Sequence, residues 1–188
     1  MPRPKTRPDS EILEAALLHM QRVGAERLTF SALAVTTGLS PSTLVQRFGS
    51  KDAMARAALS HAWDRLDDDT ARLAASVERT PSGSVDLLVR LSGSYGDITI
   101  YADGLMLLRE DIRDPVLRQR GVRWGQALVD AVSTCFAQTP GAPASIGRMM
   151  ITQWQGALLW WSFQPDEPVP VYVEKELSSF VEALALPV

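Results

Sequence analysis

The chain has 188 residues, a net charge of −3, and 46% hydrophobic and 22% charged residues, the composition of an ordinary globular protein. No apolar run approaches the roughly 18 residues needed to cross a bilayer, so no membrane association is expected. The single cysteine, Cys135, excludes an internal disulfide scaffold and indicates a reducing, cytoplasmic location. Two histidines and one cysteine offer no metal-ligand spacing, so we expect neither a metal nor a cofactor.

Charge is distributed unevenly along the chain. Residues 1–60 contain eight Lys and Arg against five Asp and Glu, whereas residues 61–188 contain eleven against seventeen. Three prolines stand among Arg3, Lys5 and Arg7, which predicts a flexible basic arm over residues 1–8. A basic amino-terminal third on an acidic body favours a small head that binds a polyanion.

Residues 9–51 are expected to form three short helices. Asp9 or Ser10 can cap the first, whose apolar spacing runs to Gly24, and Thr29 can cap the second, which should stop at Gly38. Ser40 is then an N-cap, and Pro41 occupies the first position of a third helix over residues 41–48. Two short helices joined by a glycine-containing turn are typical of a helix-turn-helix.

The third helix has one apolar and one polar side. At 100° per residue, Leu44, Phe48 and Pro41 should face the core. Ser42, Thr43 and Gln46 should face outward, with Val45 and Arg47 at the flanks. Such groups suit base edges and phosphates: Gln pairs with adenine, Arg with guanine or phosphate, and Val contacts the thymine methyl. The same pattern also fits a helical hairpin with an ordinary polar exterior, in an all-α core that binds no nucleic acid.

A resemblance favours the DNA-binding interpretation. The segments ILEAALLHM and GAERLTFSALAVTTGLSPSTLVQRFGSKDAM resemble the DNA-binding domain of TetR-family transcriptional repressors over roughly residues 9–59. The family commonly carries a tyrosine where Val45 stands, so that phosphate contact is missing here. The resemblance implies DNA contacts by Arg3, Lys5, Arg7, Thr29, Ser40, Pro41, Ser42, Thr43, Val45, Gln46, Arg47 and Lys51. In this set, Ser42, Thr43 and Gln46 would contact bases. Thr29, Arg47 and Lys51 would bind phosphates, and the arm would reach adjacent phosphates or a minor groove.

Residues 52–188 are expected to form a helical body, which gives an all-α protein of about nine helices. Helices are predicted over 52–76, 85–100, from Pro115 to about 138, over 144–163 and over 171–185, with further helix at 101–111. The segments 79–84 and 139–145 should be loops because they are rich in Pro, Gly and Ser.

Two functions are predicted for this body. Aromatic and methionine residues are candidates for an effector pocket: Trp63, Tyr95, Tyr101, Met106, Met149, Met150, Trp154 and Trp160. At helical spacing such residues are more often plain core. Apolar and small residues of the last two helices are candidates for a dimer interface: Ile146, Gly156, Val173, Leu177, Phe180, Val181 and Leu184. The resemblance implies that pocket, a small apolar or amphipathic effector, and a homodimer through a four-helix bundle.

The resemblance therefore implies a repressor that is released from a near-palindromic double-stranded DNA operator by a small-molecule effector. The first alternative is a helical protein-interaction module without DNA binding. The second is an enzyme, but no GxSxG, HExxH, P-loop or dinucleotide fingerprint is present, so no catalytic residue is predicted.

Overall fold

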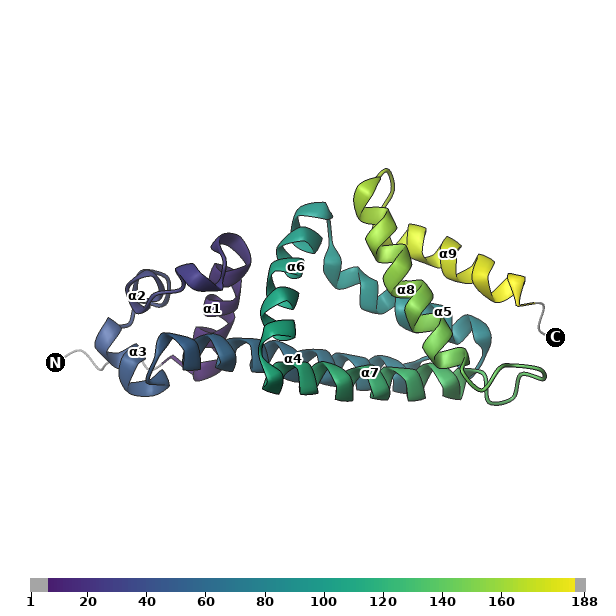
Figure 1. Cartoon of the computed structure of the whole chain (residues 1–188), viewed down its shortest axis with the longest axis horizontal. Helices are drawn as coiled ribbons and strands as arrows, with labels where there is room; N and C mark the ends of the chain where they lie inside the picture. The colour runs from purple at the N-terminus through teal and green to yellow at the C-terminus, as the bar shows by residue number, and fades with distance from the viewer. Residues whose placement is uncertain (1–6, 185–188) are drawn as a thin grey trace. The chain divides into compact units, whose positions relative to one another are not determined.

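The chain is all-α in the computed structural model, which describes residues 7–184 with the exception of the Ser94 side chain. Within these residues there is no strand (Figure 1). The helices are α1 (Asp9–Val23), α2 (Phe30–Thr37), α3 (Pro41–Phe48), α4 (Lys51–Ser76), α5 (Pro81–Ser92), α6 (Ile98–Arg113), α7 (Pro115–Cys135), α8 (Ile146–Phe163) and α9 (Val169–Ala183). Short 3₁₀ turns, η1 (Ala25–Arg27) and η2 (Gly93–Tyr95), follow α1 and α5. The predicted fold class is confirmed. Among the described helices, none is both long and apolar enough to cross a membrane.

Two compact units divide the chain. The first contains the described part of Met1–Leu66 together with Asp103–Gly121, and the second contains Asp67–Ala102 and the chain from Val122 onward. The unit boundaries fall inside α4, α6 and α7. The predicted functional division at residue 51 does not coincide with these packing units, because the first turns of α4 belong to the core of the head.

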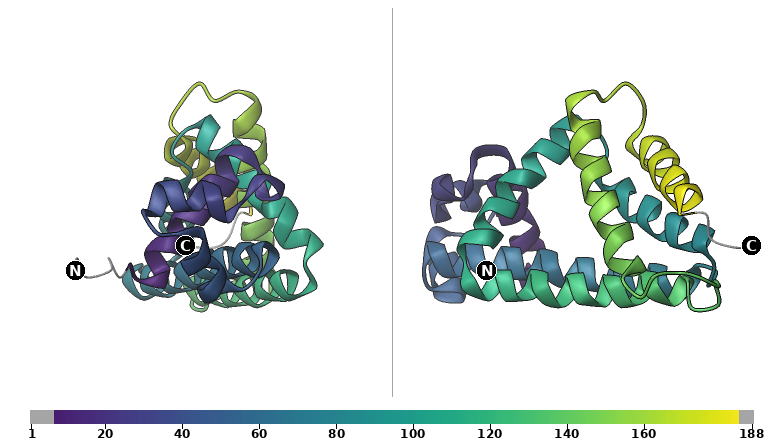
Figure 2. Two further views of the ribbon diagram at one scale, coloured as in Figure 1. Left: turned by 90° about the vertical axis from the view of Figure 1, so that its left-hand side faces the viewer. Right: turned by 45° about the vertical axis from the view of Figure 1, so that its right-hand side comes forward.

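The first unit is built around α1. Ile12, Ala16 and Met20 recur at helical spacing and are completely buried, together with Leu33 of α2 and Leu44 of α3. The same cluster contains Met54 and Ala58 of α4, and Leu107 and Leu117 near the α6–α7 junction. The left-hand view of Figure 2 faces the purple and blue helices α1–α3. Burial of this apolar face leaves the opposite sides of α2 and α3 at the surface.

Local capping signals explain the short helices of the head. Thr29 Oγ1 accepts a hydrogen bond from the Ala32 N–H at 3.1 Å, and Gly38 ends α2 in the left-handed conformation with a φ of 69°. Both features agree with the sequence prediction. The start of α1 differs: Pro8 occupies the N-cap position and no side chain caps this helix. Asp9 lies instead in the first turn, where the helix dipole favours an acidic side chain.

The second unit packs α9 against both α5 and α8. Leu87 and Leu88 of α5, Trp154 of α8, and Val173 and Leu177 of α9 are buried in its core. The right-hand view of Figure 2 shows the yellow α9, the green α8 and the teal α5 as neighbours. Gly147 permits a close approach of α8 to α7, since an added Cβ would overlap Ser133 and the carbonyl of Val129.

Two predicted boundaries in the second unit were wrong. The expected loop over 79–84 is shorter, because α5 already begins at Pro81, with Thr80 as its N-cap. Thr80 Oγ1 accepts a hydrogen bond from the Gly83 N–H at 3.1 Å. The expected continuous helix over 85–100 is interrupted at residues 93–97, where Gly96 adopts a φ of 60°.

Candidate nucleic-acid interface

Helix α3 begins with a capping arrangement. Ser40 Oγ accepts a hydrogen bond from the Thr43 N–H at 3.1 Å, and Pro41 holds the first helical position. Behind it, Thr37 Oγ1 donates to the Leu33 carbonyl at 2.7 Å within the buried end of α2. Together with the left-handed Gly38, these contacts set α3 at an angle to α2 over a very short connection.

The outer face of α3 carries the predicted base-reading groups. Ser42, Val45 and Gln46 are exposed, whereas Leu44 is completely buried. Thr43 and Phe48 are half-buried. The outward orientation of Ser42 and Gln46 agrees with the helical-wheel expectation. Pro41 differs, because it is exposed at the start of the helix instead of facing the core.

The hydroxyl groups at the start of α3 bond to one another. Ser40 Oγ lies 2.8 Å from Ser42 Oγ and 2.8 Å from Thr43 Oγ1. Because the Ser40 hydroxyl carries one proton, at least one of the other two hydroxyls donates to it. Within residues 7–184 the Gln46 amide makes no hydrogen bond. Its donor and acceptor are therefore the least committed polar groups on this face.

The predicted phosphate ligands have different surroundings. Thr29 is exposed, and its Oγ1 accepts the cap hydrogen bond, which leaves its proton free to be donated. Lys51 Nζ donates to the Glu26 carbonyl at 3.2 Å on the exposed surface. Arg47 turns toward the start of α1, where Nη1 lies 3.1 Å from Asp9 Oδ1. Arg3 and Lys5 lie outside the described residues, and Arg7 is half-buried.

Comparison with known proteins identifies the head. Residues 12–58 match the family described as bacterial regulatory proteins of the tetR family. The amino-terminal head therefore resembles the domain that this family model describes. This match covers most of the predicted resemblance over residues 9–59. A search of the curated proteins finds no match to the chain.

Solved structures of transcriptional regulators share the fold of nearly the whole chain. A transcriptional regulator from Pseudomonas aeruginosa is 14% identical with a TM-score of 0.74, covering 96% of this chain and 92% of its own. A regulator from Saccharomonospora viridis, solved in complex with choline, is 19% identical with a TM-score of 0.70. The match covers 91% of this chain and 93% of that regulator. The TetR-family regulator PfmR from Thermus thermophilus is 18% identical with a TM-score of 0.64 and coverages of 89% and 94%.

The predicted effector-pocket residues fall into separate groups. Tyr95, Tyr101, Met150 and Trp154 belong to the second unit, where Tyr101 makes edge-to-face contacts with Tyr95 and with Trp161. The ring centroids of these two pairs lie 5.5 and 6.1 Å apart. Burial, and then the nearby Tyr101, raise the pKa of Tyr95 to about 12, so both hydroxyls stay neutral. Sequence reasoning missed Trp161. Its position seven residues after Trp154, which places both on the same side of α8, could have indicated it.

The remaining pocket candidates lie elsewhere. Trp160 is 68% exposed, and it lies with Met149 on the side of α8 away from the buried Trp154. Trp63 and Met106 belong to the first unit, and Met106 is 42% exposed. The predicted set of eight therefore does not form one cluster in either unit.

Three of the seven predicted dimer residues belong to the core. Ile146, Val173 and Leu177 are buried inside the second unit, so they are unavailable to a partner in this conformation. Phe180, Val181 and Leu184 are half-buried. The buried part of the α9 stripe, Val173 and Leu177, packs inside the unit, where α9 contacts α5 and α8.

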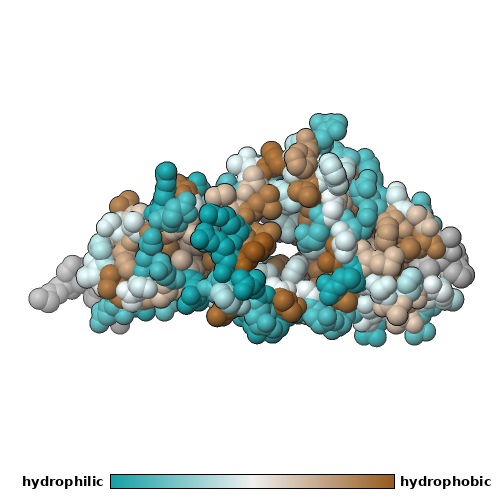
Figure 3. Space-filling model, in the orientation of Figure 1, coloured by the Kyte–Doolittle hydropathy of each residue, from teal (hydrophilic) through white to brown (hydrophobic). Residues whose placement is uncertain are grey.

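A second apolar side of α8 is exposed, and sequence reasoning missed most of it. At 100° per residue, one side opposite the buried Trp154 carries Met149, Thr152, Gly156, Leu159, Trp160 and Phe163, which we call the outer face of α8. Leu159, Trp160 and Phe163 are 47%, 68% and 74% exposed. Figure 3 shows hydrophobic brown residues among polar teal ones over the region of α8. Apolar residues on two opposite sides of one helix are the signal that would have located this face.

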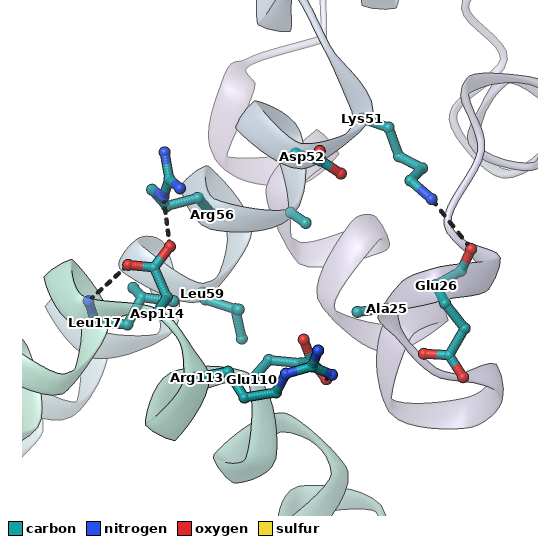
Figure 4. Close-up of a pocket in the computed structure, with 11 residues that line it drawn as sticks. Ala25, Glu26, Lys51, Asp52, Arg56, Leu59, Glu110, Arg113, Asp114 and Leu117 are labelled. Atoms are coloured by element: carbon teal, nitrogen blue, oxygen red, sulfur yellow. Dashed lines mark hydrogen bonds and ion pairs between the residues drawn. The ribbon is translucent and has the colours of Figure 1, made fainter.

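The first unit also contains a surface hollow of about 330 Å³ beside the start of α4 (Figure 4). Asp114 accepts a hydrogen bond from Arg56 Nε at 2.7 Å on one side of the hollow, and the Lys51–Glu26 contact lies on the opposite side. The bond from Arg56 lowers the pKa of Asp114. Cations and carboxylates alternate around the hollow, so it shows no preference for either sign of ligand charge. Within the described residues, no three His, Cys, Asp or Glu side chains are placed to share a metal ion.

Proposed function

We propose that this TetR-like transcriptional regulator is a cytoplasmic repressor that binds a near-palindromic DNA operator and is released by a small-molecule effector. The observation that carries the proposal is the outer face of α3, where the exposed Ser42, Val45 and Gln46 stand opposite the buried Leu44. A short helix with a buried spine and a polar outer face can enter a major groove while its neighbour braces it.

Base recognition is assigned mainly to Gln46 and Val45. The uncommitted amide of Gln46 can pair bidentately with adenine, and the Val45 methyl groups can contact a thymine methyl. We therefore expect an A·T pair within each half-site. Ser42 and Thr43 are expected to contribute less, because their hydroxyls already bond to Ser40.

Backbone binding is assigned to Thr29, Lys51 and the arm residues Arg3 and Lys5, whereas Arg7 pairs with Glu11. Thr29 can donate its hydroxyl proton to a phosphate while still capping α2. Lys51 can exchange its one backbone acceptor for a phosphate, since the contact is exposed. Each phosphate neutralised in this way releases counterions and adds to the salt dependence of binding.

A homodimer is proposed through the outer face of α8. The second copy of the chain would cover Leu159, Trp160 and Phe163, and nothing lies within 4 Å of a Cβ added at Gly156, so this position can accept an approaching helix. A two-fold pair would present two α3 helices to successive turns of a palindromic site, about 34 Å apart.

The effector is proposed to be a small apolar or amphipathic molecule that contacts the Tyr95–Tyr101–Trp161 cluster of the second unit. Structural relatives were solved with choline and with imidazole, which are small and polar or cationic, and aromatic rings can contact either kind of molecule. Release from DNA requires the effector to bind the DNA-free state more tightly. A difference of about 2.7 kcal/mol weakens operator binding about a hundredfold.

A gel shift with the DNA upstream of the protein's own coding sequence tests this function. A discrete complex that survives excess unrelated DNA supports the proposal. Absence of any complex at low ionic strength favours the alternative, a helical module that binds protein.

A further inference from the structure

We infer that Arg47 does not bind the DNA backbone but positions the recognition helix, by clamping α3 to the first turn of α1. This also assigns a role to Asp9, whose negative charge would otherwise only repel DNA from the proposed binding surface. The inference rests on the proposed DNA binding and concerns how that surface is assembled.

The clamp consists of two bonds from one guanidinium. Arg47 Nη1 donates to the Arg7 carbonyl at 2.7 Å and to Asp9 Oδ1 at 3.1 Å. The bonded residues are 40 and 38 positions away in sequence, so the contact joins the carboxyl-terminal half of α3 to the start of α1. The Arg47 side chain is 25% exposed, although Arg47 as a whole residue is exposed like its neighbour Gln46. Hydrogen bonds to a charged donor are stronger than neutral ones, so this contact can hold the helix in register.

The charges around Arg47 argue against phosphate binding. Arg7 lies 3.7 Å from Glu11, and Asp9 lies beside Arg47, so the cluster holds two cations and two carboxylates. Its net charge is therefore zero. Both carboxylates are more than half exposed, and a phosphate that approached Arg47 would meet them. A neutral cluster releases no DNA counterions, whereas a free arginine would release about one.

Removal of the Asp9 charge distinguishes phosphate binding by Arg47 from positioning of α3, because the two roles predict opposite changes in operator affinity. If Arg47 binds a phosphate, Asp9→Asn frees the guanidinium and removes a repulsive charge, so operator binding becomes tighter. If Arg47 positions α3, Asp9→Asn replaces the charged acceptor with a neutral amide and weakens the clamp, so operator binding weakens by up to roughly threefold to tenfold, the range expected for a partly exposed charged contact.

Arg47→Ala should then weaken operator binding by a similar factor. It should leave the slope of log affinity against log salt concentration unchanged. The double variant Asp9→Asn/Arg47→Ala should bind no more weakly than Arg47→Ala alone, because both changes act on the same contact.

Glu11→Gln is the matched control. Glu11 is also an acidic residue in the first turn of α1, so its removal has the same effect on charge and helix dipole, but it makes no contact with Arg47. We expect this variant to bind the operator as tightly as the unaltered protein, or up to about twofold more tightly. Circular dichroism melting of all four variants checks that the head stays folded.

The experiment measures fluorescence anisotropy of a labelled operator at four salt concentrations, using the full chain. Weakening by both single variants, with an unchanged salt slope and no additivity, supports the clamp. Tighter binding by Asp9→Asn, a fall of about one in the salt slope of Arg47→Ala, or no effect of either variant overturns it. If the unaltered protein binds no DNA, the proposed function fails and the clamp falls with it.

Discussion

Gln46 and Lys51 stand five residues apart, and their surroundings imply different contributions to DNA binding. Gln46 has an exposed amide with no hydrogen bond among residues 7–184, so its bonding geometry is available to a base pair. Lys51 is a flexible point charge at the start of α4, held only by one exposed carbonyl. A planar amide suits sequence recognition, whereas an ammonium group suits the uniform phosphate backbone.

The pair Gln46→Ala and Lys51→Ala separates specificity from affinity. Gln46→Ala should cost about 1–3 kcal/mol of discrimination at one base pair per half-site, with little change in salt dependence. Lys51→Ala should weaken binding evenly across sequences and lower the salt slope by about one. Affinities for single-base operator variants, measured at several salt concentrations, distinguish the two. Equal salt slopes for both variants would contradict these roles.

Asp111 should make the stability of the first unit depend on pH. Burial raises the pKa of Asp111 to about 6. The hydrogen bond from Trp63 Nε1 at 3.0 Å acts in the opposite direction and lowers the pKa, but its effect is smaller. Because the folded pKa lies above the unfolded value, the folded chain binds more protons between about pH 4 and 6, and stability falls as the pH rises through that range.

Asp111→Asn keeps an acceptor for Trp63 and removes the ionisable group. We expect the variant to be about 1 kcal/mol more stable than the unaltered chain at pH 7.5, after allowance for solvent screening, and no more stable at pH 4.5. Urea unfolding of both proteins at the two pH values measures this difference. Lower stability of the variant at pH 7.5 would show that the charged form is favoured.

At the scale of the element, local signals predicted the head well. The N-caps Thr29 and Ser40 and the stops Gly24 and Gly38 act within a few residues, so a single sequence reveals them. Thr80–Pro81 is the same signal as Ser40–Pro41, and α5 begins there, although the surrounding Pro, Gly and Ser favoured a loop.

Contacts between distant segments could not be predicted. Arg47 was expected to face DNA because the helical wheel shows a side chain's direction but not its tertiary partner, Asp9. In the same way, α9 has one apolar stripe, and only its packing against α5 and α8 shows that Val173 and Leu177 of this stripe are buried inside the second unit. For α8, apolar residues stand on two sides of the helix, so the sequence does not show which side is buried. In the structure Trp154 is buried and Trp160 is exposed.

Gly147 is expected to be required for the packing of α8 on α7. Gly147→Ala should destabilise the protein by about 1–3 kcal/mol or more, since its Cβ would overlap the backbone of α7. Gly125→Ala is the control within α7, where nothing lies within 4 Å of an added Cβ, and it should stabilise the helix by up to about 1 kcal/mol. Chemical unfolding of the two variants gives the comparison. Equal effects would argue against a tight contact.

The outer face of α8 gives a prediction about assembly. Trp160→Glu places a charge in the proposed apolar interface and should convert a dimer to a monomer, while Gln155→Glu, on the polar side of the same helix, should leave it intact. Sedimentation velocity at micromolar concentration reports the two masses. If both variants remain dimeric, the interface lies elsewhere.

At the scale of the whole molecule, the proposed release from DNA by an effector requires one unit to bind DNA and the other to bind the effector. The first contains the entire helix-turn-helix, and the second contains the aromatic cluster and the outer face of α8. The unit boundaries fall within three helices, so each of these helices contributes residues to both units. By linkage, an effector that weakens operator binding must itself be bound less tightly by the DNA complex, by the same factor.

Selection of binding sites from random duplex DNA by the purified full-length protein tests the central claim most directly. The account predicts enrichment of a near-palindrome whose half-site centres lie about one helical turn apart, with an A·T pair in each half-site whose preference is lost in Gln46→Ala. Failure to enrich any sequence at low ionic strength, or an enriched site that Gln46→Ala selects unchanged, would contradict it.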